Sequence, residues 1–263
     1  MGNRRASRGT QVGPVSKPPD RPRLLLVPLL TEIEWLIRPA LEEWAEVASF
    51  DAPGVGDEPR AEMFGREAIA QRALEEVDRR GWDSCVVVVD GSAIATAMHF
   101  VRARPKIVDA LALGHARLSD ETDGERAPRN KEIIEAVGQL LRVDYGNFVR
   151  YGLAQATHGS MGEDLAQRML ERVPFEIGQE TWEMVAHEQE QFEDTLRQLD
   201  VPLLFAKHDG CLGNTDEGFE DAVAAFPEAR TVTCPEAPSV SSDFAAALQS
   251  FVMSQTHTSS SGR

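Results

Sequence analysis

One short segment of the chain combines a potential nucleophile with the local structure that would expose it. The apolar run Cys85–Val89 leads into Asp90, Gly91 and Ser92, and a helical pattern follows at once. A serine in a tight turn between a strand and a helix is the arrangement of a nucleophile elbow, in which the hydroxyl lies exposed above the sheet. The backbone around Gly91 and Ala93 would then line an oxyanion site. The segment therefore predicts a nucleophile position at Ser92.

The elements around this segment alternate between short apolar runs and helical patterns. This alternation is typical of a parallel sheet with crossover helices, and near-continuous apolar runs indicate strands that are buried on both faces. The expected strands are Arg23–Val27, Val47–Phe50, Cys85–Val89, Val108–Leu113, Pro202–Ala206 and Arg230–Cys234. The expected helices are Thr31–Trp44, which opens on a Thr31/Glu34 capping box, Glu62–Arg80 and Ser92–Arg104.

A long interval between two of these strands contains no convincing strand. It reads as three or four helices, Lys131–Val143, Asp144–Gln155, Glu163–Val173 and Glu180–Leu199. A block of helices inserted between strands of a parallel sheet predicts a cap over the core. We therefore expect a core from residues 22–128 and 200–253, a cap from 129–199, and unstructured tails at 1–21 and 254–263.

The order of elements resembles the α/β-hydrolase superfamily over residues 23–116 and 200–252. It is similar to bacterial members in which an Asp-x-x-Gly-x-Gly turn follows the Trp-containing first helix, here Asp51–Asp57. The segment Ala103–Leu113 also resembles the helix–Pro–strand segment after the elbow of that family. The resemblance implies a mostly parallel α/β-hydrolase-like sheet with crossover helices and an inserted helical cap.

The same resemblance implies a catalytic triad that this chain completes only in part. Asp209, after the strand that follows the cap, takes the place of the acid, although an Asp-Gly turn residue is the alternative reading. The family's histidine would lie between Thr233 and Phe244, and that stretch contains none. Without an imidazole, a serine hydroxyl lacks the base that takes its proton.

Two further departures affect the elbow and the oxyanion loop. Asp90 and Ile94 stand where the family has glycines, which relieve crowding in the strained turn. Pro28 and Leu29 replace the His-Gly that shapes the oxyanion loop, and a proline has no N–H to donate.

Two of the six histidines are alternative base candidates. His115 follows the strand after the elbow helix, and His208 is adjacent to Asp209. Both lie at the carboxyl ends of expected strands, where sites form in open α/β sheets. A third segment, His158–Gly162, resembles an elbow by its letters but follows a helix, so we interpret it as a helix–helix turn with Ser160 as N-cap.

Composition excludes several classes of function. The 263-residue chain has a formal net charge of −16, which disfavours binding to nucleic acids and to anionic membranes. The three cysteines are too few and too scattered for a disulfide framework or a zinc site. No apolar stretch reaches membrane-spanning length, and no secretory signal precedes the core. We expect a cytoplasmic protein without a metal or cofactor, and the oligomeric state stays open.

Three functions fit these observations. The first is an α/β-hydrolase-fold protein that is non-catalytic or very weakly active and binds a small, partly apolar ligand or a peptide under the cap. The second is an active, esterase-like serine hydrolase that uses Ser92. The third is an interaction or scaffold protein that docks through its cap helices, because a fold alone does not determine function.

Overall fold

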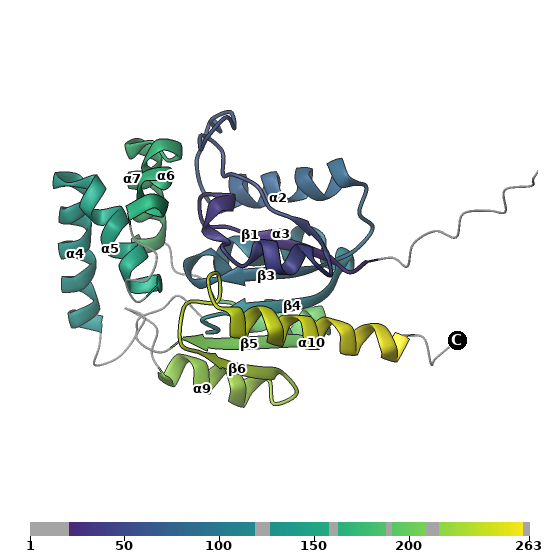
Figure 1. Cartoon of the computed structure of the whole chain (residues 1–263). Helices are drawn as coiled ribbons and strands as arrows, with labels where there is room; N and C mark the ends of the chain where they lie inside the picture. The colour runs from purple at the N-terminus through teal and green to yellow at the C-terminus, as the bar shows by residue number, and fades with distance from the viewer. Residues whose placement is uncertain (1–20, 119–126, 158–162, 188–190, 209–215, 260–263) are drawn as a thin grey trace, which may run out of the picture.

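A six-stranded parallel sheet forms the centre of the computed structural model, which describes residues 21–118, 127–157, 163–187, 191–208 and 216–259 (Figure 1). The strands lie in the order β2-β1-β3-β4-β5-β6, and every neighbouring pair is parallel. Their bounds are β1 Arg23–Val27, β2 Glu46–Ala48, β3 Cys85–Asp90, β4 Val108–Gly114, β5 Leu203–His208 and β6 Arg230–Cys234. The parallel α/β sheet expected from the sequence is confirmed.

Helices cover both faces of the sheet because successive side chains of a strand point to opposite faces. Leu25 and Val87 pack toward α2, α3 and α9, whereas Leu24 and Val86 pack toward α1 and α10. Burial on both faces explains why the strands appear as continuous apolar runs. The bounds of these helices are α1 Arg38–Glu42, α2 Arg66–Arg80, α3 Ile94–Ala103, α9 Asp216–Ala225 and α10 Ser242–Ser259.

Five helices lie between β4 and β5 in the described part of this interval, and α4–α7 gather at one end of the sheet (Figure 1). We keep the name cap for these five helices, α4–α8. Their bounds are α4 Ala127–Val143, α5 Tyr145–Thr157, α6 Glu163–Arg172, α7 Phe175–His187 and α8 Glu193–Leu199.

The single helix expected over Glu180–Leu199 is wrong, because the structure has α7 and α8 in its place. Phe192, at the start of α8, is fully buried, and its backbone N–H donates to the Leu118 carbonyl at 2.7 Å. This contact ties the chain back to the segment after β4, so the helix cannot run straight through.

Three other boundaries differ from the expectation. The helix expected over Thr31–Trp44 is broken into a 3₁₀ turn, η1 (Glu32–Glu34), and α1, which has a proline in its first turn. Helix α2 begins at Arg66, after Gly65, rather than at Glu62. Helix α10 continues to Ser259, beyond the expected end of the core at 253, because no glycine or proline interrupts it. The expected N-terminal tail lies outside the described residues, apart from its last position.

Candidate functional site

Three adjacent strands bring polar side chains to one edge of the sheet. The strand register pairs Asp90 with Gly114, and Gly114 with Ala206, so the residues that end β3, β4 and β5 are neighbours. His115 Nδ1 lies 2.6 Å from Asp90 Oδ1, and His115 Nε2 lies 3.1 Å from His208 Nδ1. The Asp90 carboxylate accepts a hydrogen bond from the Nδ1–H group of His115 and so orients the imidazole ring.

The backbone of His115 is held in an unfavourable conformation. Its φ is 55°, in the left-handed region, and the residue is only 5% exposed. A non-glycine residue there costs about 1–3 kcal/mol and persists only where its surroundings determine it. The Asp90 hydrogen bond and the burial supply that constraint, and strain of this kind is typical of functional sites.

Asp90 is a buried carboxylate whose neighbours favour its charged form. Burial alone would raise the pKa of Asp90, but the His115 imidazole and a hydrogen bond from the Ser239 N–H hold that pKa below its ordinary value. The Ser239 N–H lies 3.0 Å from Asp90 Oδ2. Asp90 is therefore an anion at neutral pH, with a donor on each carboxylate oxygen.

Glu34 occupies the loop that follows β1. Its carboxylate accepts hydrogen bonds from the backbone N–H groups of Leu29, Leu30 and Thr31, each at 3.0 Å. Burial raises the pKa of Glu34 to about 7, even though the three hydrogen bonds act to lower it, and the nearby charge of Asp90 raises it further. The N–H groups of this loop are thus already engaged by an internal carboxyl group.

The turn between β3 and α3 has its left-handed residue at Gly91, where φ is 54°. Ser92 is the next residue, and it lies in the 3₁₀ turn η2 (Gly91–Ala93) with an ordinary negative φ. A side chain on Gly91 would start 3.9 Å from His115 Nδ1 with no closer neighbour. The bend is the position from which a side chain would point toward the His115 imidazole, and a glycine occupies it.

A cavity of about 390 Å³ lies between the strand ends and the cap. One end of it carries Glu34, Asp90, His115 and His208, and Gly91 and Ser92 also line it. The rest of the lining is mostly apolar and aromatic, and it includes Val27, Leu30 and Trp35 from the core and Tyr145, Phe148, Leu153, Met169 and Trp182 from the cap. An apolar cavity with a few convergent polar groups is the usual form of a small-molecule site.

Solved structures of similar shape identify the architecture. An esterase from Thermogutta terrifontis is 20% identical, with a TM-score of 0.69 over 89% of this chain and 90% of that one. The chain has the α/β-hydrolase fold. An enol-lactonase from Burkholderia xenovorans is 13% identical, with a TM-score of 0.67 over 90% of this chain and 92% of that one. A hydrolase from Oleispira antarctica is 12% identical, with a TM-score of 0.66 over 82% and 83%. No protein-family model and no curated protein sequence matches the chain.

Within this α/β-hydrolase fold, the structure can be compared with the expected site residues. Ser92 is half-buried and lines the cavity, and its hydroxyl has no hydrogen-bond partner among the described residues. Leu29 is in the loop after β1, where its N–H donates to Glu34, and Ala93 is the buried last residue of η2. Asp209 lies outside the described residues.

The loop after β6 occupies the place expected for the missing histidine. Ala237, Ser239 and Val240 of this loop line the cavity, and none of them can act as a base. The Ser239 backbone contributes instead by donating to Asp90. The alternative base candidates, His115 and His208, are the imidazoles that the fold brings to the site.

Two members of this site are not expected from the sequence. Asp90 stands out there only because it replaces an elbow glycine, and Glu34 only because it belongs to a capping box. A usable signal was present for Asp90, because Asp90, His115 and His208 each end or follow a strand, and the carboxyl ends of parallel strands share one edge. No sequence signal indicated that Glu34 would face the cavity.

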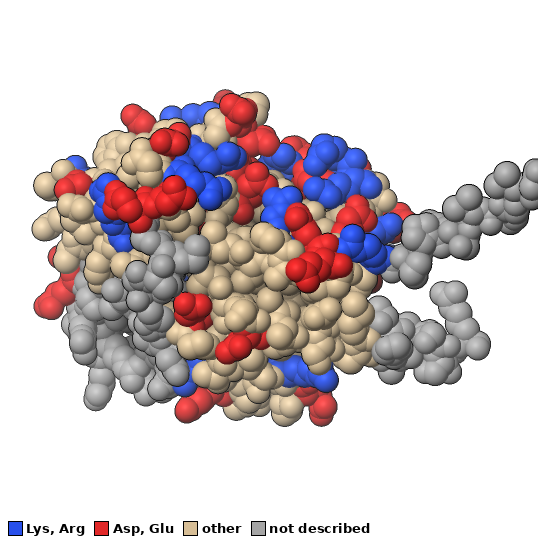
Figure 2. Space-filling model, in the orientation of Figure 1, with Lys and Arg blue, Asp and Glu red and all other residues tan. Residues whose placement is uncertain are grey.

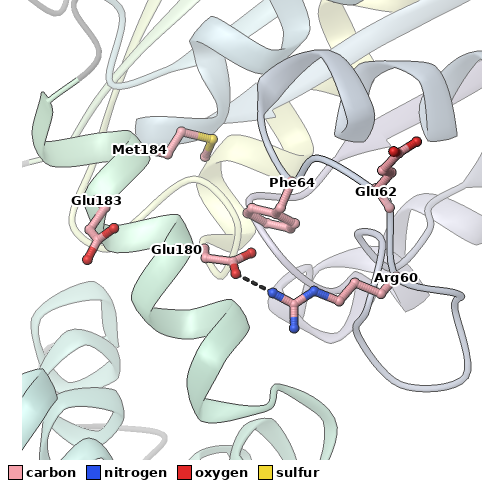
Figure 3. A pocket seen from close by; sticks show the side chains of 7 residues that line it. Arg60, Glu62, Phe64, Glu180, Glu183 and Met184 are labelled. Carbon is pink, nitrogen blue, oxygen red and sulfur yellow. Dashed lines mark hydrogen bonds and ion pairs between the residues drawn. The ribbon is translucent and has the colours of Figure 1, made fainter.

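The cap is anchored to the core beside a second, more open hollow (Figure 3). Arg60, in the segment before α2, pairs with Glu180 of α7 across this hollow, and Phe64 faces Met184 nearby. Asp51 binds Arg172 at the end of α6 and also accepts a 2.7 Å hydrogen bond from Thr31. These contacts attach α6 and α7 of the cap to the core.

Charges of both signs are mixed on the visible surface of the described residues. On the face shown in Figure 2, lysine and arginine side chains lie among acidic side chains rather than in a broad basic surface. The described residues contain no group of three or more His, Cys, Asp or Glu that would hold a metal ion. Among the described helices, none is long and apolar enough to cross a membrane.

Proposed function

We propose that this protein binds a small, largely apolar molecule in the cavity under the cap and does not use Ser92 to hydrolyse esters. The observation that carries the proposal is the glycine at the bend of the elbow. In a nucleophile elbow the strained residue is the nucleophile itself, and Gly91 has no side chain to attack with. Ser92 follows the bend, so its hydroxyl takes a different direction from the one the elbow provides.

The surroundings of the turn support the same proposal. The N–H groups of Leu29 and Leu30 would have to stabilise a developing oxyanion, but both donate to Glu34. A carboxylate in that position repels negative charge on a reacting oxygen, which is the opposite of what acyl transfer requires. His115 binds Asp90 and His208, and no hydrogen bond between either imidazole and Ser92 Oγ is present among the described residues.

The cavity supports binding rather than a purely structural role for the cap. A scaffold that docks through its cap helices needs no internal space, and filled clefts are the expectation for it. Here about 390 Å³ stays open between apolar and aromatic side chains. Burying apolar ligand surface in such a space is favourable at about 25 cal/mol per Å².

Active-site labelling tests the chemical part of the proposal. We expect a fluorophosphonate reagent to leave the protein unlabelled, and p-nitrophenyl ester turnover to be the same in the wild type and in Ser92→Ala. Labelling that depends on Ser92, with a loss of turnover of about 10³-fold in the alanine variant, would establish a serine hydrolase instead.

A binding measurement tests the other part. The neutral fluorophore N-phenyl-1-naphthylamine should bind with enhanced emission and quench the cavity tryptophans Trp35 and Trp182. Gly152 lines the cavity, and a side chain there meets no atom within 4 Å, so Gly152→Leu should fill space without disturbing the helix and weaken binding. Ala154→Leu, two residues along the same helix and outside the lining, is the matched control. Equal binding by all three proteins would refute a ligand site in this cavity.

A further inference from the structure

The ionisable groups of the cavity set a limit on its charge. The described lining residues include Glu34, Asp90, His115, His208 and Tyr145, but no lysine or arginine. Burial raises the pKa of Tyr145 to about 12, so its phenol stays neutral. The charge at the polar end therefore depends on two carboxyl groups and two imidazoles.

The hydrogen bond between the two imidazoles limits how much positive charge they can carry. His115 Nε2 and His208 Nδ1 are 3.1 Å apart, and such a bond needs one nitrogen with a proton and one with a lone pair. The pair can thus hold at most one positive charge, and Asp90, 2.6 Å from His115, balances it. Glu34 is either neutral or negative. With Asp90 ionised, the described groups at the polar end therefore sum to a neutral or a negative charge.

Aromatic rings line the space next to this polar end. Tyr145 and Phe148 stack with centroids 6.3 Å apart, and Phe148 meets Trp182 edge to face at 5.8 Å. Trp35 lines the cavity from the core side. Aromatic faces attract cations through their quadrupoles, most strongly where water is excluded.

We propose that the cavity selects an organic cation, namely a small molecule with a protonated or quaternary ammonium group and an apolar body. The ammonium group lies beside Glu34 and Asp90, and the apolar body lies against the aromatic rings of the cap. This inference rests on the proposed function, because it names the chemical class of the ligand for the same cavity. An anionic ligand would meet two carboxyl groups with no cationic side chain among the described lining residues to receive it.

The protonation of Glu34 makes the selectivity depend on pH. The other ionisable groups at the polar end, among the described residues, are Asp90, His115 and His208, and Asp90 contributes to the raised pKa of about 7. A cation favours the ionised carboxylate, so binding releases the proton of Glu34. The ionised fraction falls from about nine-tenths at pH 8 to about one-tenth at pH 6, so a ligand that binds only the ionised form loses roughly tenfold in affinity.

The test uses three probes of similar shape and different charge. Phenyltrimethylammonium is cationic, tert-butylbenzene is its neutral counterpart, and benzenesulfonate is anionic. Each competes with N-phenyl-1-naphthylamine for the full-length protein at pH 6 and pH 8. We expect the cation to bind roughly tenfold more tightly than tert-butylbenzene at pH 8, which is the range of a desolvated cation–π contact with the aromatic rings. Benzenesulfonate should bind more weakly than either.

Glu34→Gln separates charge from shape. In this variant the affinity for phenyltrimethylammonium should lose its dependence on pH and its advantage over tert-butylbenzene, which still binds. Retained binding of tert-butylbenzene also shows that the variant is folded. Two results would show that the proposed ligand class is wrong although the cavity binds ligands. In the first, phenyltrimethylammonium binds no more tightly than tert-butylbenzene, and in the second, benzenesulfonate binds most tightly. If no probe binds, the proposed function itself fails.

Discussion

Because of Glu34, the free energy of unfolding should fall as the pH rises from about 4.5 to about 7. In the folded state burial raises the pKa of this carboxyl group from 4.5 to about 7. In the unfolded chain the group ionises at its ordinary pKa. Between these two values the folded state holds more protons than the unfolded state, so raising the pH favours unfolding. Above about pH 7 the group is ionised in both states, and its effect becomes constant.

The size of the effect follows from the two pKa values. Going from pH 5.5 to pH 8, this single group should lower the free energy of unfolding by about 2 kcal/mol. Glu34→Gln keeps the side-chain shape and one acceptor oxygen but cannot ionise. The variant loses the hydrogen bond from the Leu29 N–H. This loss lowers the free energy of unfolding equally at both pH values, so it does not affect the change between pH 5.5 and pH 8.

Urea unfolding of both proteins at pH 5.5 and pH 8, followed by circular dichroism, measures the effect. The wild type should lose about 2 kcal/mol more than Glu34→Gln over this range. Glu43→Gln, at an exposed position in the same part of the chain, controls for the change in net charge and should behave like the wild type. If the wild type and Glu34→Gln showed an equal pH dependence, the pKa of Glu34 in the folded protein would be the ordinary one. The electrostatic account of the loop after β1 would then be wrong.

Three further outcomes are expected. Gly91→Ala should lower the free energy of unfolding by about 1–2 kcal/mol because its φ is 54°, whereas Gly152→Ala, in a helix with open space around it, should raise it by about 0.5–1 kcal/mol in the same urea titration. Asp51→Asn should cost about 1–3 kcal/mol and speed limited proteolysis within the cap, because the substitution weakens the bond to Arg172; unchanged cleavage would argue against this anchor. Cys85 is 1% exposed and burial raises the pKa of its thiol to about 12, so Ellman's reagent should react with it at pH 8 only after denaturant is added.

The sequence predicted the sheet well because each strand carries its own signal. Continuous apolar runs such as Cys85–Val89 can be buried only between two layers of helices, and their alternation with helical patterns leaves few topologies. Helix boundaries were less predictable where a tertiary contact decides them. The break between α7 and α8 depends on the buried Phe192 and on the hydrogen bond from its N–H to the Leu118 carbonyl. No local sequence pattern predicts this contact.

The candidate site was predictable only as a location. The strand–turn–helix pattern placed the turn correctly, but the letters alone favoured Ser92 as its functional residue, whereas the backbone bends at Gly91. The partnership of Asp90 with His115 requires the register of two strands that are separated by a helix. Glu34 ends η1, which is separate from α1, and the proline in the first turn of α1 is a local signal for this break. That the Glu34 side chain would line the cavity has no such local signal.

The position of the cap in the chain also sets the order in which the strands can pair during synthesis. Strands β1–β4 are complete once residue 114 has left the ribosome, but β4 must wait for β5, which begins at Leu203, before its outer edge is paired. At the usual rate of synthesis the intervening residues, roughly 90, take about 5–20 s. During that time the apolar edge of β4, with Leu111 and Leu113, is unpaired and open to association with other chains unless another segment covers it.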